Sequence, residues 1–365
     1  MKNKTSIIIL LLVLFVMAGC GNKEVAIGEG DLNETPAEEA IIEREIPEEA
    51  QEPIPIDPKE LIDLSLMPNE LGKIMVLMYH NIDEVEQDWV RTPDNFRKDL
   101  NNLYEQGYRP LSLTDFATGN ITTEQGYTPV IITFDDAQEN NMRYLEDGTV
   151  DPDCAVGILV AFHEMHPDFP LEVTFFADGP SAFGSSDEEI AKINYIIEQG
   201  MDIGNHTQNH VNFKDADAEK IQKEIGGQAQ NLESLIDAET YKVNTLALPY
   251  GSRPRADELE IYLQKGSYEG VSYENLAILN VGSNPAYSPF DERFDALHLP
   301  RVRASEMNVD NVGMYSYLEY FINHPEAKFI SDGNAQIITV PEGSENVVSN
   351  GKEIYFYEPE VSSEE

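Results

Sequence analysis

Short apolar runs alternate with longer amphipathic segments from Ile74 onward. Runs of this kind, separated by helical patterns, are typical of βα units around a parallel sheet. The sequence therefore predicts an α/β fold. Its expected strands are residues 74–79, 129–134, 171–177, 201–205, 244–248 and, with the weakest pattern, 276–281.

Three segments have the apolar spacing of amphipathic helices. The first follows a capping box at residues 186–189 and ends at Gly200, since glycine is a frequent C-terminal stop. The second covers residues 215–236. The third covers residues 306–321, with Ser305 as its expected N-cap.

The N-terminal pattern is that of a secretory signal. Lysines precede an uninterrupted run of apolar or small residues over 7–19, and this run is shorter than the roughly 18 residues that a membrane span needs. It ends in Val16-Met17-Ala18-Gly19-Cys20, which resembles a bacterial lipobox. We expect residues 1–19 to be removed and Cys20 to be lipidated, which would make the protein extracytoplasmic and anchored to the cell membrane. The alternative is an ordinary signal peptide followed by an incidental cysteine.

The segment after Cys20 has the composition of a disordered linker. Residues 21–70 contain 15 acidic and 3 basic side chains and six prolines. Such a chain repels itself and buries little apolar surface. We therefore expect residues 20–70 to form an acidic disordered tether.

The folded part is expected to follow this tether. We assign residues 71–327 to the main domain. Residues 328–365 are expected to form a small β appendage and tail, in which 328–340 and 353–357 have strand-like patterns.

The charge balance excludes several classes of partner. The 365 residues include 67 Asp and Glu against 24 Lys and Arg, a formal net charge of −43. A nucleic-acid-binding protein needs a clustered basic surface, which this chain has too few cations to build.

The two cysteines form no disulfide framework. Cys154 lies near an apolar run, and we expect it to be an inert buried thiol.

Polar side chains follow four of the predicted strands. The carboxyl ends of parallel strands meet at one edge, where α/β proteins place their active sites. These side chains are therefore expected to line a single cleft. They are, in chain order, His80, the pair Asp135 and Asp136, the pair His206 and His210, and the Pro249-Tyr250-Gly251 segment.

The residue types suit metal-assisted hydrolysis. Adjacent carboxylates diverge, so one of Asp135 and Asp136 can bind a metal while the other takes a proton. His206 and His210 would face one side of a helical turn, and two imidazoles with one carboxylate make the open three-ligand site of catalytic zinc. The alternatives are an acidic turn and a chance pair of surface histidines.

Four motifs occur in an order that resembles a known family. They are Thr133-Phe134-Asp135-Asp136, Thr174-Phe175-Phe176, Gly204-Asn205-His206-Thr207-Gln208-Asn209-His210 and Leu248-Pro249-Tyr250-Gly251. Together they resemble the polysaccharide deacetylases of carbohydrate esterase family 4, the NodB-homology group, over roughly residues 72–305. An early Leu77-Met78-Tyr79-His80-Asn81 resembles the branch with the poly-N-acetylglucosamine deacetylases, in which a first-strand histidine replaces a late one.

The resemblance implies a fold and a role for each motif residue. The fold would be a distorted (β/α) barrel. Asp135 would be the general base on a metal-bound water that attacks the acetyl carbonyl, and Asp136, His206 and His210 would bind a divalent metal, zinc or else cobalt. The backbone N–H of Tyr250 would contribute to an oxyanion hole, and His80 would be the general acid.

Three positions depart from the family pattern. Ala137 stands where many members have glycine, and Ala247 stands where many have an arginine that orients the catalytic aspartate. We expect Arg301, in Leu299-Pro300-Arg301-Val302, to take that orienting role. His298 is an alternative to His80 as the general acid.

The favoured function is removal of N-acetyl or O-acetyl groups from an extracellular polysaccharide or oligosaccharide. Peptidoglycan, poly-N-acetylglucosamine, chitin fragments and acetylxylan all fit as substrates. The alternative is a catalytically inactive lipoprotein that keeps the fold for carbohydrate binding or envelope assembly. Its main support is the pair of departures at Ala137 and Ala247.

Overall fold

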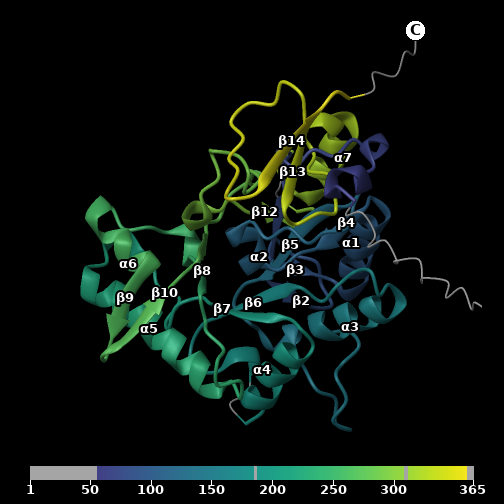
Figure 1. Ribbon diagram of the computed structural model, residues 1–365. Helices are drawn as coiled ribbons and strands as arrows, with labels where there is room; N and C mark the ends of the chain where they lie inside the picture. Colours follow the sequence, from purple (N-terminus) through teal and green to yellow (C-terminus); the bar gives the residue numbers. More distant parts are fainter. Residues whose placement is uncertain (1–55, 185–186, 308–310, 360–365) are drawn as a thin grey trace, which may run out of the picture. The chain divides into compact units, whose positions relative to one another are not determined.

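The computed structural model describes residues 56–184, 187–307 and 311–359 (Figure 1). The predicted signal, Cys20 and most of the predicted tether lie outside the described residues. Within the described ranges, no helix combines the length and the apolar character needed to cross a bilayer.

An eight-stranded sheet forms the centre of the domain, in the order β11-β8-β7-β6-β5-β1-β12 with β4 beside β5. Every pairing in it is parallel. All six predicted strands are present, whereas β4 and β12 were not predicted. The strands are β1 (Met75–Tyr79), β4 (Tyr108–Pro110), β5 (Thr128–Phe134), β6 (Val173–Ala177), β7 (Asp202–Asn205), β8 (Thr245–Ala247), β11 (Ala277–Leu279) and β12 (Val302–Arg303).

The two ends of this sheet curl toward each other. Leu279 of β11 forms a parallel bridge with Leu299, three residues before β12 begins. The first and last strands of the order are thus linked through the segment 299–301. The predicted distorted (β/α) barrel is confirmed.

Seven α-helices lie among the described residues (Figure 1). The predicted helices at 189–200 and 215–236 correspond to α4 and α5, although Ser186 of the expected capping box lies outside the described residues. The helices are α1 (Pro93–Glu105), α2 (Leu113–Thr118), α3 (Ala155–Met165), α4 (Glu189–Glu198), α5 (Ala218–Leu235), α6 (Ile261–Gln264) and α7 (Met314–Asn323).

The predicted start of the third helix is wrong. The helix α7 begins at Met314, not at 306, with Gly313 as its N-cap. Ser305 does accept a hydrogen bond, from the Met307 N–H at 3.1 Å, but it closes only a local turn. The turn at Ser305 is therefore separate from the start of α7.

The strands are buried on both faces, which explains their nearly continuous apolar runs. In β1, Met75, Leu77 and Tyr79 belong to one apolar cluster. Ile74 and Val76 belong to a second cluster, which also includes residues of β5, β6, β8 and β11. This alternation follows the two-residue period of a strand.

The folded part begins earlier than residue 71. Residues 58–66 form two 3-10 turns, Asn69 pairs with Ile330, and the Glu70 carboxylate accepts a hydrogen bond from the Thr339 N–H at 3.1 Å. This part of the predicted tether is therefore packed against the C-terminal segment. The local charge did not reveal these partners because they lie more than 250 residues away.

The C-terminal segment is also part of the core. The strands β13 (Ile337–Pro341) and β14 (Glu353–Tyr357) pair with each other in parallel, and Ile338 and Val340 belong to the same cluster as Val76. The strand expected over 328–340 is thus shorter, and it packs on the barrel. Two smaller sheets complete the domain, β2 (Asn81–Ile82) with β3 (Val90–Arg91) and β9 (Lys265–Tyr268) with β10 (Val271–Glu274).

Candidate active site

A cavity of about 570 Å³ opens where β1, β5, β7, β8 and β11 end. The sheet order places these strand ends along one edge, so motifs far apart in the sequence meet there. The predicted residues in its wall are His80, Asp135, Asp136, His206, His210 and Tyr250.

Asp136, His206 and His210 form a cluster that fits a metal ion. Asp136 Oδ1 lies 3.4 Å from His206 Nε2 and 3.5 Å from His210 Nε2, and the three donor atoms lie within 4.8 Å of one another. His206 Nδ1 lies 2.8 Å from the carbonyl oxygen of Ala247. A proton on Nδ1 therefore leaves the lone pair of Nε2 directed at Asp136, as a metal ligand requires.

The two histidines do not meet on a helical turn, which corrects the expectation from their spacing. Thr207 and His210 have φ angles of 68° and 47°, so the chain turns through left-handed residues. Asn205 Oδ1 accepts from the Thr207 N–H at 2.8 Å, and Glu224 of α5 accepts from the Asn209 N–H at 2.9 Å. These contacts fix a strained loop that brings the ring centroids of the two histidines to 5.0 Å.

Asp135 forms a buried ion pair with Arg301. Arg301 Nη1 and Nη2 donate to the two Asp135 carboxylate oxygens, each at 2.6 Å. Arg301 Nε donates to the carbonyl oxygen of Asn280 at 3.0 Å. Both side chains are buried, and a bidentate contact of this kind fixes the carboxylate in position and orientation. The arginine absent at Ala247 therefore has a counterpart at Arg301.

Both site carboxylates are held in the ionised form. Burial disfavours the charge on Asp135, but Arg301 and the nearby histidines outweigh it, so the pKa of Asp135 lies below its usual value. Burial is likewise outweighed at Asp136 by His206 and His210, so the pKa of Asp136 is lowered. Burial also opposes a charge on His206, yet the two carboxylates raise the pKa of its imidazole.

The backbone after β5 keeps the turn that a glycine would make. Asp136 and Ala137 have φ angles of 72° and 39°. A left-handed conformation costs a non-glycine residue about 1 kcal/mol or slightly more. The substitution of alanine for glycine at 137 thus leaves Asp136 directed at the histidines.

Tyr250 presents its backbone to the cavity on a strained turn. It lies in a 3-10 turn, Pro249–Gly251, with a φ of 59°. Its neighbours Gly251 and Ser252 donate to the carbonyl oxygens of Leu248 and Pro249, whereas the Tyr250 N–H has no acceptor among the described residues. A free N–H at the edge of a cavity is available to a developing oxyanion.

The structure separates the two candidate general acids. His80 lines the cavity. Burial lowers the pKa of His80, against the opposing effect of Asp135 and Asp136. His298 is exposed, pairs with Asp295 at 2.8 Å, and is not among the residues that line the cavity.

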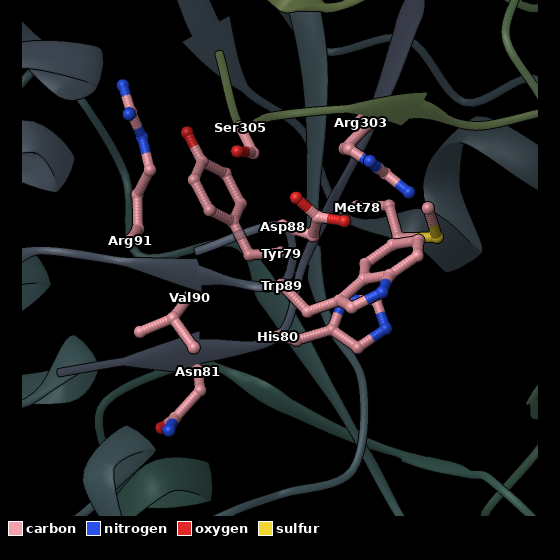
Figure 2. A pocket seen from close by; sticks show the side chains of 10 residues that line it. All are labelled: Met78, Tyr79, His80, Asn81, Asp88, Trp89, Val90, Arg91, Arg303 and Ser305. Atoms are coloured by element: carbon pink, nitrogen blue, oxygen red, sulfur yellow. The ribbon is translucent and has the colours of Figure 1, made fainter. Parts of the chain in front are cut away.

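Sequence reasoning missed several cavity residues, most notably Trp89. It belongs to the loop between β2 and β3, and its indole lies beside the His80 ring (Figure 2). It is the single tryptophan of the chain and follows the first strand by ten residues, which was the available signal. The others are Asn81, Val90, Gln138, Leu248 and Val281.

Several solved structures are similar to this chain. Among solved structures, the chain is similar to a polysaccharide deacetylase from Bacillus cereus (18% identity, 68% of this chain and 69% of that chain, TM-score 0.49). It is also similar to a Streptococcus pyogenes deacetylase in complex with acetate (18%, 68% and 98%, 0.48) and to IcaB from Ammonifex degensii (16%, 68% and 97%, 0.48). No curated protein matches the sequence.

The family model described as Polysaccharide deacetylase matches residues 123–266. This stretch includes β5 to β8, and with them Asp135, Asp136, His206, His210 and Tyr250. His80 and Arg301 lie outside it and reach the same site through the fold. The matched stretch of the chain is therefore similar to the polysaccharide deacetylase family.

Proposed function

We propose that the protein is a metal-dependent deacetylase that hydrolyses acetyl groups of an extracellular polysaccharide, in the first place N-acetyl groups of aminosugars. The observation that carries this proposal is the ionised Asp135, fixed by Arg301, beside the Asp136, His206 and His210 donor set in one cavity. A protein that only binds carbohydrate needs no positioned base next to a set of metal ligands.

Asp136, His206 and His210 would hold the divalent metal, zinc or else cobalt. When bound, such an ion polarises a carbonyl oxygen and makes water acidic enough to react at neutral pH. Nitrogen and oxygen donors in a three-residue set with an open side are those of catalytic zinc sites.

The remaining residues supply the proton transfers and the charge stabilisation. Asp135 accepts the proton of the attacking water, because Arg301 leaves it ionised and directed into the cavity. The N–H of Tyr250 donates to the oxygen on which negative charge develops. His80, the one imidazole in the cavity wall outside the metal set among the described residues, protonates the departing amine or alcohol.

Acetate release from defined substrates tests this function. Purified full-length protein is incubated with zinc or cobalt and with acetylated glucosamine oligomers or acetylxylan. We expect acetate release that stops on chelation and returns with the metal. The His206→Ala, His210→Ala double variant is the control and should lose both the metal and the activity. A metal-loaded protein that releases acetate from none of these substrates would favour a carbohydrate-binding role.

We also propose that the enzyme is held at the outer face of the cell membrane through lipidated Cys20. The support is the sequence around Cys20, which lies outside the described residues. In cells fed a labelled fatty acid, the chain should acquire label and partition into detergent, whereas the Cys20→Ala variant should not. An unlabelled wild-type chain would contradict the proposed lipid anchor, while the proposed deacetylase activity would be unaffected.

A further inference from the structure

We propose that Trp89 is a positioning residue that holds the His80 imidazole for proton transfer, with Arg303 stacked on the indole. The proposal rests on the proposed deacetylase function, because it assigns His80 a proton to deliver. It differs from the usual expectation for an aromatic residue in the wall of a glycan site, which is to stack on a sugar ring.

The three side chains form a stack at the side of the cavity. The ring centroids of His80 and Trp89 are 4.5 Å apart, with an interplanar angle of 46°. The guanidinium carbon of Arg303 lies 3.7 Å from the centroid of the Trp89 ring. Figure 2 shows the indole between the other two side chains. Arginine is suited to this place because its planar, weakly hydrated head stacks on aromatic faces.

Arg303 already lies over the indole, where a sugar would stack. Trp89 is 41% exposed, and the Arg303 guanidinium and the His80 ring both contact its indole. A sugar that stacked where Arg303 lies would have to displace its guanidinium. The arrangement therefore favours a role for Trp89 toward His80 rather than toward a sugar.

His80 needs such a support because its ring lacks a hydrogen-bond anchor. Its Nδ1 atom is buried and has no partner among the described residues. An imidazole that takes part in proton transfer is usually oriented by a hydrogen bond to its second nitrogen. Packing against the indole supplies the restraint that the missing bond would give.

Backbone pairing and one side-chain ion pair hold the segments that carry the three residues. The Asn81 N–H, directly after His80, donates to the carbonyl oxygen of Trp89 at 3.1 Å. Arg303 is in register with Met78, two residues before His80, in the pairing of β1 with β12. Arg91, two residues after Trp89, is fixed by a buried pair with Asp99. Trp89 is thus fixed next to His80 through Asn81 and Arg91, and Arg303 is fixed next to it through β12.

Steady-state kinetics on an acetylated oligosaccharide test the proposal. We expect Trp89→Ala to lower kcat by about 10-fold to 100-fold, because misplacing a catalytic group has effects of this size, with KM changed less than about threefold. Trp89→Phe should recover part of kcat. Tyr320→Ala on α7 is the matched control, since Tyr320 is also aromatic and 43% exposed, and should leave both constants unchanged. A raised KM with kcat retained in Trp89→Ala would overturn the proposal in favour of a sugar platform.

An NMR measurement that needs no turnover tests the role of Trp89 independently of the proposed deacetylase activity. The ring-proton NMR signals of His80, assigned with the His80→Gln variant, should carry the ring-current shift of the adjacent indole and lose it in Trp89→Ala. Metal content should stay unchanged. Unaltered His80 signals would overturn the proposal even in an active enzyme. If the wild type releases no acetate, the deacetylase function fails, while the NMR result still decides whether Trp89 holds His80.

Discussion

Carboxylates are buried to the same extent at two places in this domain, but their pKa values are shifted in opposite directions. At the site, Asp135 is 2% exposed and faces the guanidinium of Arg301. Where the two terminal segments meet, Glu70 and Asp332 are 2% and 3% exposed. Their hydrogen bonds come from the backbone N–H groups of residues 332, 334 and 339 and from the Thr339 hydroxyl.

The partners, rather than the burial, decide the charge. At Glu70, burial and then the neighbouring Asp332 raise the pKa well above its ordinary value. Burial also raises the pKa of Asp332. At Asp135, burial acts in the same direction but the cation prevails, so the pKa is lowered. A buried carboxylate that stays ionised can act as a base, whereas one that has gained a proton cannot accept another.

The largest expected effect comes from neutralising the site carboxylate. Asp135→Asn should lower kcat for acetate release by about 10³-fold or more, because the amide cannot accept the proton of the attacking water. Metal content should stay near the wild-type value, since Asp136, His206 and His210 are untouched. Kinetics and metal analysis on the same sample check both parts. Unchanged turnover would contradict the role of Asp135 as the base.

Removing the cation should cost stability as well as activity. Arg301→Met keeps much of the side-chain volume but leaves Asp135 buried without its counter-charge. Breaking one side of a buried pair costs about 3–5 kcal/mol, so we expect a loss of this size in the free energy of unfolding by urea. The pKa of Asp135 should rise. Arg255→Met is the control, because Arg255 and its partner Asp215 are both exposed, and it should cost far less.

Much of the fold followed from the sequence because its strands are buried on both faces. The six apolar runs gave six strands of the sheet, and the polar residues at their ends lie around one cavity. A parallel sheet brings its strand ends to one edge whatever the loops do. This is why Asp135, His206 and Tyr250 could be grouped without a structure.

What could not be predicted depends on contacts between distant segments. The turn between His206 and His210 is shaped by α5, which follows it, and not by its own spacing. Trp89 carried no motif, and it reaches His80 only because β2 and β3 pair. The last residues before position 71 were predicted to belong to the tether, because their partners at residues 330 and 339 are distant in the sequence.

A matched substitution at the buried pair of Glu70 and Asp332 should have little effect on stability. Asp332→Asn retains an acceptor for the Asn334 N–H and a partner for the Thr339 hydroxyl, while it removes the repulsion with Glu70. We expect the free energy of unfolding at pH 7 to change by less than about 1 kcal/mol, or to increase, because no buried group loses its partner. A loss of about 3 kcal/mol, as at the site, would show that this cluster relies on its charges.

The smallest expected effect is on how the stability difference between Asp332→Asn and the wild type depends on pH. The pKa values of Glu70 and Asp332 are raised by folding, so above their ordinary values the unfolded chain releases protons that the folded chain still holds. Stability from these groups therefore falls as the pH rises above about 4. Asp332→Asn removes one of them, so its stability relative to wild type should increase as the pH rises above about 4 in urea titrations. A difference that shrinks over this range would mean that Asp332 is stabilised in its ionised form, as Asp135 is.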